Sequence, residues 1–326
     1  MPFFKDDGQV AVIVAIIIIV LIGMVVLVVD VGSLYEDRRQ LQTVADAAAL
    51  AGAQDLPEDP VNAVQKAVDY ANSNGVAITS SDVQILTTLV DNDTITVTPV
   101  DPNAKLYFAS VFGVNSASVS ATATATANSP VGMSGLVPWA VLEDDTISTG
   151  DLKVMKVAAP DKNGPGFFGA MHFEHEGVPG GGAKLYKENI VSGCTEVIFT
   201  GNYYPIEPGN MAEPTDKGVD TRIDDDIHTF TAPIVLLNEA GEYVGHDATC
   251  PRIVIVPVID AFPENPSDDV LVVNFGVFFI ESIDVEGKGG NAEASVSGRF
   301  VKYMIAVSSS ETTGYTGGIK VIRLVK

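Results

Sequence analysis

The stretch GQVAVIVAIIIIVLIGMVVLVVDVGSLYEDRRQLQTVADAAALAGA, residues 8–53, decides the N-terminal part of the fold. Its first part, residues 10–29, contains no charged side chain. At about 1.5 Å per helical residue this apolar run extends about 30 Å, which matches the hydrocarbon thickness of a bilayer. A secretory signal has a shorter apolar core, of about 7–15 residues, followed by a small-x-small cleavage site, and no such site follows here. We therefore expect a retained transmembrane helix.

Beyond the apolar run, residues spaced three or four positions apart form a stripe along one side of the helix. The side chains of this stripe become smaller toward residue 53. Small side chains allow another element to approach the helix backbone closely, so we predict that this stripe serves helix packing or assembly. Pro57 and Pro60 remove backbone donors and end the helix near Gln54. With Asp30 at its start, the predicted packing set is Asp30, Leu34, Arg38, Leu41, Ala45, Ala48 and Gly52.

Asp30 is the first charged residue after the apolar run. A carboxylate at the edge of a membrane span is costly unless it is solvated or paired. Two roles are open: solvation among the lipid headgroups, or an ion pair with Lys5, the amino terminus or an arginine of a neighbouring chain. The second role would set the register of helices in an assembly.

We expect residues 57–129 to form a small α+β domain. Asp59 before Pro60 is typical of a helix start, and Gly75 of a helix end. Residues 116–127 alternate strictly between small apolar and polar side chains, as a strand with one buried face does. The part of the stripe within residues 45–53 is mostly alanine, and we call it the alanine stripe. We expect it to lie on this small sheet. The predicted elements are a helix over 60–75, strands over 83–89 and 94–100, a short helix over 105–113 and a strand over 116–127.

A glycine- and proline-containing stretch, residues 128–135, predicts a linker to a further domain over 130–326. Short apolar segments separated by glycine and proline turns indicate a β-rich, sandwich-like domain. The fold class is thus α+β: a transmembrane and extended helix over 1–56, the small domain over 57–129, and the β-rich domain. Its main predicted elements are strands over 253–259, 270–280, 295–306 and 319–325 and short helices over 184–192 and 214–223.

The net charge of −23 lies almost entirely beyond the apolar run, because Lys5, Asp6 and Asp7 are the only charges before residue 30. An acidic body repels phosphate backbones, which excludes nucleic acid as a partner.

Cys194 and Cys250 are the only cysteines, and both follow the predicted span. An even pair outside a membrane is compatible with a disulfide bond, which would contribute roughly 3–4 kcal/mol.

The sequence contains only weak candidates for catalytic or metal-binding sites. The oxygen ligands of Asp224, Asp225 and Asp226, and of Asp91 and Asp93, suit calcium, but neither group has the spacing of an EF-hand loop. A solvated charge run and a hairpin turn are the competing interpretations. In MHFEHEG, His172 shares a strand face with Glu174 and Glu176, which we interpret as a polar edge. No nucleophile motif such as G-x-S-x-G is present, so we expect neither an enzyme nor a bound cofactor, calcium excepted.

The opening stretch resembles the N-terminal module of the Flp (Tad) pilus-assembly TadE/TadG-like proteins. The matching parts are Gly8-Gln9, the apolar run, Val-Asp-Val-Gly at 29–32, Arg-Arg-Gln-Leu-Gln at 38–42 and Ala-Asp-Ala-Ala-Ala-Leu-Ala-Gly-Ala at 45–53. Segments of the body, such as residues 165–193 and 206–223, are similar to the longer TadG-related members. The resemblance implies a bitopic, pilin-like and non-catalytic protein whose partners are the membrane and the Tad pilus apparatus.

Three functions follow as expectations. The first is a membrane-anchored structural or assembly component of a Tad pilus. The second is a self-polymerising subunit, a homo-oligomer or filament whose N-terminal helices form the core. The third is a cation-dependent adhesin tethered by the helix. We expect the N-terminus in the cytoplasm and the body outside the cell, because Asp30, Glu36, Asp37 and the cysteine pair follow the span.

Overall fold

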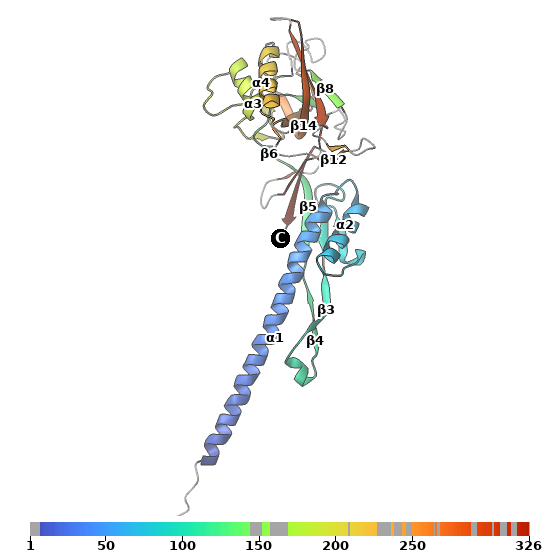
Figure 1. The fold of residues 1–326 in the computed structure, drawn as a ribbon, viewed down its shortest axis with the longest axis vertical. Coiled ribbons are helices and arrows are strands. Elements are labelled where there is room, and N and C mark those ends of the chain that lie inside the picture. Colours follow the sequence, from blue (N-terminus) through green and yellow to red (C-terminus); the bar gives the residue numbers. More distant parts are fainter. Residues whose placement is uncertain are drawn as a thin grey trace, which may run out of the picture. The chain divides into compact units, whose positions relative to one another are not determined.

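The structure of the chain, a computed structural model, has a long N-terminal helix followed by a β-rich body, as the predicted α+β class requires (Figure 1). Contacts between residues divide the chain into two compact units, Met1–Ala127 with Ile322–Lys326, and Asn128–Val321. The described residues are 7–143, 152–156, 169–207, 209–226, 236–237, 243–245, 250–263, 265, 268–287, 292–301, 303–306, 312–313 and 318–325.

The first unit packs two helices on a sheet in which β1, β2, β5 and β18 are neighbours in this order, and a separate hairpin of β3 and β4 follows β2 in the chain. Antiparallel β1 and β2 pair in the register Val83↔Val97, and β2 pairs with β5 in the register Ile95↔Ala125. The elements are α1 (Asp7–Ala53), α2 (Pro60–Ser73), η1 (Ser80–Asp82), β1 (Val83–Leu86), β2 (Thr94–Val97), β3 (Val100–Lys105), η2 (Ala109–Phe112), β4 (Ser116–Ser120), β5 (Ala123–Pro130) and β18 (Ile319–Val325).

Local sequence signals explain where several of these elements begin and end. Asp59 caps α2 by accepting a hydrogen bond from the backbone N–H of Asn62 at 3.0 Å, and Pro60 occupies the first helical turn. The predicted hairpin turn between β1 and β2 is confirmed: Asn92 has a φ of 60°, and the strands on either side pair antiparallel. α1 ends at Ala53, just before the two prolines.

Two predicted elements of the first unit differ from the structure. Residues 105–113 do not form one amphipathic helix, because β3 runs to Lys105 and pairs there with Ser116 of β4, leaving only the short η2 at the turn. Residues 116–127 do not form one strand either. Their first half pairs with β3 and their second half pairs with β2, so the strand is interrupted between Ser120 and Ala123.

The second unit is built on a sheet with the order β7-β13-β14-β15-β8, in which long β14 pairs antiparallel with both β13 and β15. Its strands are β6 (Gly132–Met133), β7 (Val141–Leu142), β8 (Leu152–Lys156), β9 (Ile198–Phe199), β10 (Tyr203–Tyr204), β11 (Leu236–Leu237), β12 (Tyr243–Gly245), β13 (Ile253–Ile259), β14 (Val270–Glu286), β15 (Glu293–Phe300), β16 (Tyr303–Ala306) and β17 (Thr312–Thr313). Its helices are α3 (Ala183–Ser192) and α4 (Ala212–Asp224).

The two faces of this sheet have different cores. Val256 and Phe278 belong to a cluster with Ile190 of α3 and Val219 of α4, so helices cover this face, where we expected a second sheet. Val277 and Phe279 belong to another cluster, in which Cys194 and Cys250 are buried. Cys194 and Cys250 are both thiols in the structure, so the expected disulfide bond is not present.

The predicted linker, residues 128–135, is largely β-structure. Residues 128–130 complete β5, where Pro130 pairs with Thr312 of β17, and Gly132–Met133 pairs with β9. Asn128 and Ser129 are buried, so the division between the units falls inside a strand and not in an exposed loop.

Candidate functional site

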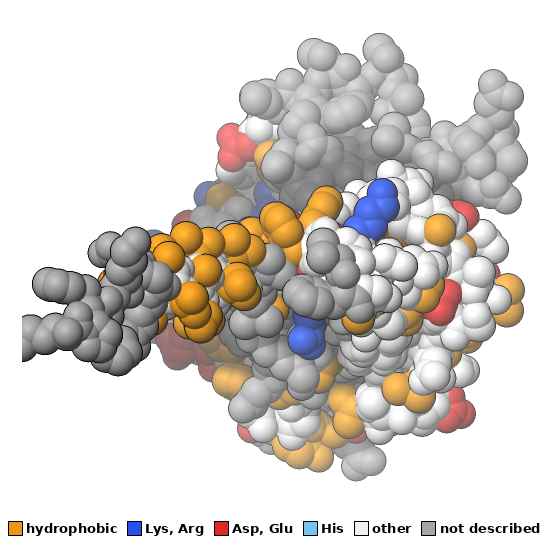
Figure 2. All heavy atoms as spheres, turned by 90° about the horizontal axis from the view of Figure 1, so that it is seen from below, with side chains coloured by type: hydrophobic (Ala, Val, Ile, Leu, Met, Phe, Trp, Pro, Cys, Tyr) orange, Lys and Arg blue, Asp and Glu red, His pale blue; other side chains and the backbone are white. Residues whose placement is uncertain are grey.

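The first half of α1 is an apolar helix surface that the chain leaves uncovered. Val10, Ile19 and Val28 are 61, 69 and 70% exposed, although each is a large apolar residue. The described part of the helix contains a window of mean hydropathy 3.7, none of which is buried, and this length and composition are those of a membrane span. Figure 2 shows the apolar side chains gathered along this part of α1.

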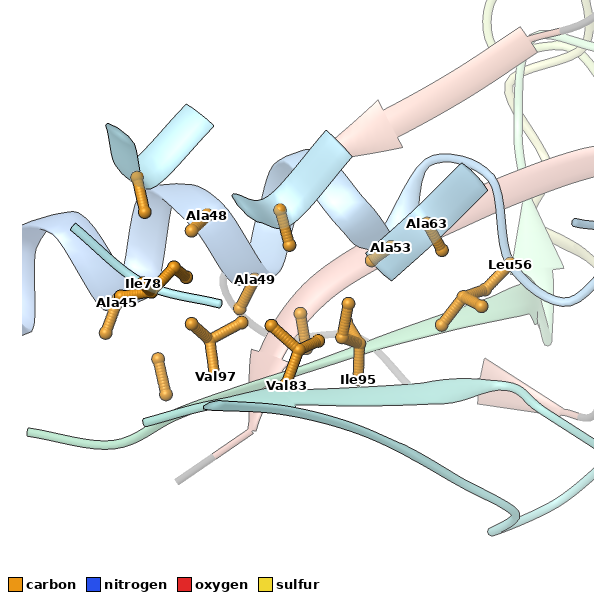
Figure 3. Packing of buried hydrophobic residues seen from close by; sticks show 14 of the residues in the cluster. Ala45, Ala48, Ala49, Ala53, Leu56, Ala63, Ile78, Val83, Ile95 and Val97 are labelled. Atoms are coloured by element: carbon orange, nitrogen blue, oxygen red, sulfur yellow. The ribbon is translucent and has the colours of Figure 1, made fainter. Parts of the chain in front are cut away.

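The second half of α1 is buried against the first unit by its alanine stripe. Ala45, Ala48, Ala49 and Ala53 are fully buried in one cluster with residues of α2 and of the sheet (Figure 3). This packing confirms the prediction that the stripe lies on the small sheet. The cluster also includes Leu56, Ala63, Ala67, Ala71, Ile78, Val83, Ile95, Val97, Ala123, Ala125, Ala127 and Ile322.

Gly52 marks the closest approach in this packing. A Cβ atom at this position would lie 2.5 Å from Cδ1 of Ile95 and 2.8 Å from the backbone oxygen of Ala63. Helix α2 and strand β2 therefore meet α1 where only a hydrogen atom fits. The predicted packing residues Ala45, Ala48 and Gly52 are thus brought together, and their partners belong to the same chain.

Asp30 has a role that the sequence did not indicate. Its side chain is only 6% exposed, and its two oxygens accept hydrogen bonds from three consecutive backbone N–H groups. Oδ1 accepts from Tyr107 at 2.8 Å and Oδ2 from Ala109 at 2.7 Å, while Phe108 donates to both oxygens. Asp30 therefore holds the start of η2, the turn between β3 and β4. Neither headgroup solvation nor an arginine pair is needed to satisfy this carboxylate, and Lys5 lies outside the described residues.

The hairpin of β3 and β4 lies against α1 through a small apolar cluster between Asp30 and the alanine stripe. Leu41 of α1 is buried there with Ala104, Val119 and Ala121, and Leu34 is partly buried against them. Of the predicted set, Arg38 differs, because its side chain is exposed. Asp30, Leu34 and Leu41 thus fix the hairpin to the helix at successive levels.

Asp93, one of the acidic residues that suit calcium, has protein partners in the structure. Asp93 accepts hydrogen bonds from the backbone N–H groups of Thr88, Leu89 and Val90. Burial raises the pKa of Asp93, but these bonds and that from the Thr88 hydroxyl outweigh it, so the pKa lies below its ordinary value. Asp93 and Asp91 thus belong to the β1–β2 turn.

The acidic run at the end of α4 is also tied to its own unit. Asp224 and Asp225 end α4, and Asp226 Oδ2 forms an ion pair with Arg252 at 3.0 Å. Within the described part of the chain, no three His, Cys, Asp or Glu side chains are grouped as metal ligands.

The described part of the second unit contains a polar cluster around Glu207, a residue that no sequence pattern pointed to. Glu207 is 6% exposed, lies 2.7 Å from Nδ1 of His172, and accepts a hydrogen bond from the backbone N–H of Gly182 at 2.9 Å. Nε2 of His172 lies 3.6 Å from the exposed Glu174. Glu207 is far from His172 in the chain, so no local pattern connects them. The cluster fixes the segment before α3 to the residues around His172.

Comparison with known proteins gives a family for the N-terminal part of the chain. No curated protein and no solved structure matches the chain. One family model matches residues 8–55, the segment that comprises the exposed apolar helix, Asp30 and the buried alanine stripe. This N-terminal segment is therefore similar to the putative Flp pilus-assembly TadE/G-like family.

Proposed function

We propose that the protein is a membrane-anchored, pilin-like and non-catalytic component of a Tad (Flp) type pilus system, in which it acts as a minor subunit or assembly partner. The single observation that carries this proposal is the division of the family module into two halves. One half of α1 is apolar and uncovered, and the other half is the central helix of a folded unit. A helix built in this way joins a bilayer to a body outside it.

The energetics of α1 support the anchoring role. Burying apolar surface contributes about 25 cal/mol per Å², so a helix whose Ile19 and Val28 side chains remain mostly exposed requires an apolar environment. A bilayer provides that environment for every face of the helix at once, and all backbone polar groups are satisfied within the helix.

We place the N-terminus in the cytoplasm and the acidic body outside. By the count of lysine and arginine the two flanks are nearly balanced, with Lys5 and the amino terminus against Arg38 and Arg39. The proposed orientation rests on the acidic residues Asp30, Glu36 and Asp37 of the flank that leads into the body, against Asp6 and Asp7 on the other flank. The buried thiols of Cys194 and Cys250 form no disulfide bond, so they no longer contribute to this orientation.

A second candidate function is a self-polymerising subunit. The same uncovered apolar half of α1 favours it, because helices of several copies would bury this surface against one another in a filament core. The alanine stripe would take no part in such a core, since Ala45 and Ala48 are already buried in their own unit.

Complementation of cells from which the gene has been deleted tests the proposal. Ile18→Asp places a charge at the centre of the span, where it costs about 2.5–3.5 kcal/mol, whereas Ile18→Leu at the same position is the matched control. We expect the leucine variant to remain in carbonate-washed membranes and to restore surface pili, and the aspartate variant to do neither. Full piliation by an aspartate variant that has left the membrane would refute the proposal.

A further inference from the structure

We propose that the hairpin tip, residues 106–114 between β3 and β4, is a second membrane-contacting element that places Tyr107 and Phe108 at the boundary between headgroups and acyl chains beside α1. This inference rests on the proposed membrane anchoring. The tip lies beside α1 on the side of the first unit from which the apolar helix extends (Figure 1).

The level of the tip along α1 is fixed by Asp30. Three backbone N–H groups of the tip bind the carboxylate of this residue, which directly follows the apolar run of residues 10–29. Because that run has the length of the hydrocarbon layer, Asp30 lies at its outer edge. The hairpin tip is therefore held at the same level, where the hydrocarbon gives way to headgroups.

The side chains of the tip suit this level. Tyr107, Phe108 and Val114 are 62, 40 and 52% exposed, although each is a large apolar residue. Aromatic side chains with an apolar body are enriched at membrane interfaces, and tyrosine keeps its hydroxyl in the headgroup layer. Tyr35 is 71% exposed and lies about 7 Å further along the helix axis than Asp30, so it extends the same aromatic belt outward.

The backbone of the tip is also prepared for an environment poor in water. Non-helical backbone enters a bilayer boundary only where its polar groups have partners. The N–H of Leu106 donates to Asn115 at 3.2 Å, that of Gly113 to Ser110 at 3.0 Å, and that of Val114 to Ala109 at 3.2 Å. The Ser110 hydroxyl donates to the carbonyl of Tyr107 at 2.8 Å.

These hydrogen bonds and those to Asp30 satisfy backbone groups of the tip, and the side chains of Tyr107 and Phe108 remain exposed. At this level along α1 the tip would contact a lipid surface, because the exposed tip continues the uncovered apolar surface of α1.

Depth-dependent fluorescence quenching in vesicles tests the inference. The full chain is reconstituted in phosphatidylcholine vesicles with an NBD reporter on Val114→Cys at the tip, on Ile18→Cys in the span, or on Val61→Cys, an 81% exposed valine of α2. Cys194 and Cys250 are each 3% exposed, which keeps labelling at the introduced thiol. We expect nitroxide lipids labelled near the headgroup to quench the tip reporter strongly and the Val61 reporter hardly at all.

The outcomes separate this inference from the proposed anchor. A tip reporter as unquenched as the Val61 reporter, with the Ile18 reporter quenched by nitroxides deep in the acyl chains, would overturn the inference and leave the anchor standing. An unquenched Ile18 reporter would overturn both. A tip reporter whose emission depends on protein concentration and not on nitroxide lipids would assign the tip to a second copy of the chain instead.

A side-chain variant links the signal to the aromatic residues. Replacement of Tyr107 and Phe108 by serine should abolish most of the quenching at the tip without changing the Ile18 signal, because both side chains are exposed and the clamp on Asp30 uses only the backbone. Tyr70→Ser, at a 48% exposed tyrosine of α2, is the matched control and should leave the tip signal unchanged. Unaltered quenching in the double variant would overturn the role of the two aromatic residues.

Discussion

Asp30 shows how a single carboxylate joins two segments that are 77 residues apart in the chain. Three backbone N–H donors satisfy both of its oxygens, and hydrogen bonds to an ionised carboxylate are stronger than those between neutral groups. Its position after the apolar run made it noticeable in the sequence. Its partners were not predictable, because backbone N–H groups have no sequence signature.

Asp30→Asn tests this clamp at the residue scale. The amide retains one acceptor oxygen, loses the charge and replaces the second acceptor by a donor, so the N–H groups of residues 107–109 lose part of their bonding. In hydrogen exchange with mass spectrometry on the full chain in nanodiscs, we expect faster exchange at the hairpin tip. Glu36→Gln, an exposed residue of the same helix, is the control. Unchanged exchange in Asp30→Asn would show that the clamp does not order the tip.

The cysteines give a second prediction at this scale. Burial raises the pKa of the Cys194 thiol to about 11, so almost none of it is thiolate at neutral pH. We expect iodoacetamide at pH 8 to leave Cys194 and Cys250 unmodified in the native protein. After unfolding without a reductant, mass spectrometry should find both alkylated. Labelling that requires prior reduction would mean that the two residues form a disulfide bond after all.

At the scale of elements, α1 carries two contrasting glycines. Gly52→Ala introduces a Cβ atom 2.8 Å from the backbone oxygen of Ala63, and overpacking of this kind costs about 1–3 kcal/mol. Gly32→Ala meets no atom within 4 Å, and alanine is favoured over glycine by about 1 kcal/mol in a helix interior. We therefore expect a lower free energy of unfolding for Gly52→Ala and an equal or higher one for Gly32→Ala.

Denaturant titration of the full chain in detergent, followed by circular dichroism, measures both variants. Equal stability of the two variants would contradict the close packing of α1 against α2 and β2.

The elements that were predicted correctly are those whose signals are local. The proline and cap of α2, the turn at Asn92 and the small-residue stripe of α1 each specify their structure within a few residues. The predicted helix over 105–113 failed because a weak amphipathic pattern competed with strand pairing between β3 and β4, which involves residues further along the chain.

At the scale of the whole molecule, the segment that matches the family model is covered by segments that lie far from it in the chain. Residues 8–55 match the family model, yet the alanine stripe within them is covered by α2, by the sheet of β1, β2 and β5, and by Ile322 near the C-terminus. Of these contacts, the sequence predicted the one with the sheet, from the small side chains of the stripe and of the strand. It did not place Ile322 there, because a short apolar strand pattern does not specify which sheet the strand joins.

We propose above that the protein serves the pilus from the membrane by means of α1. Immunogold electron microscopy of piliated cells, with antibodies against the acidic body, tests this claim most directly. We expect gold particles along the cell envelope and no regular labelling along the fibres. Regular labelling along the length of the fibres would contradict it and would identify the protein as the polymerising subunit.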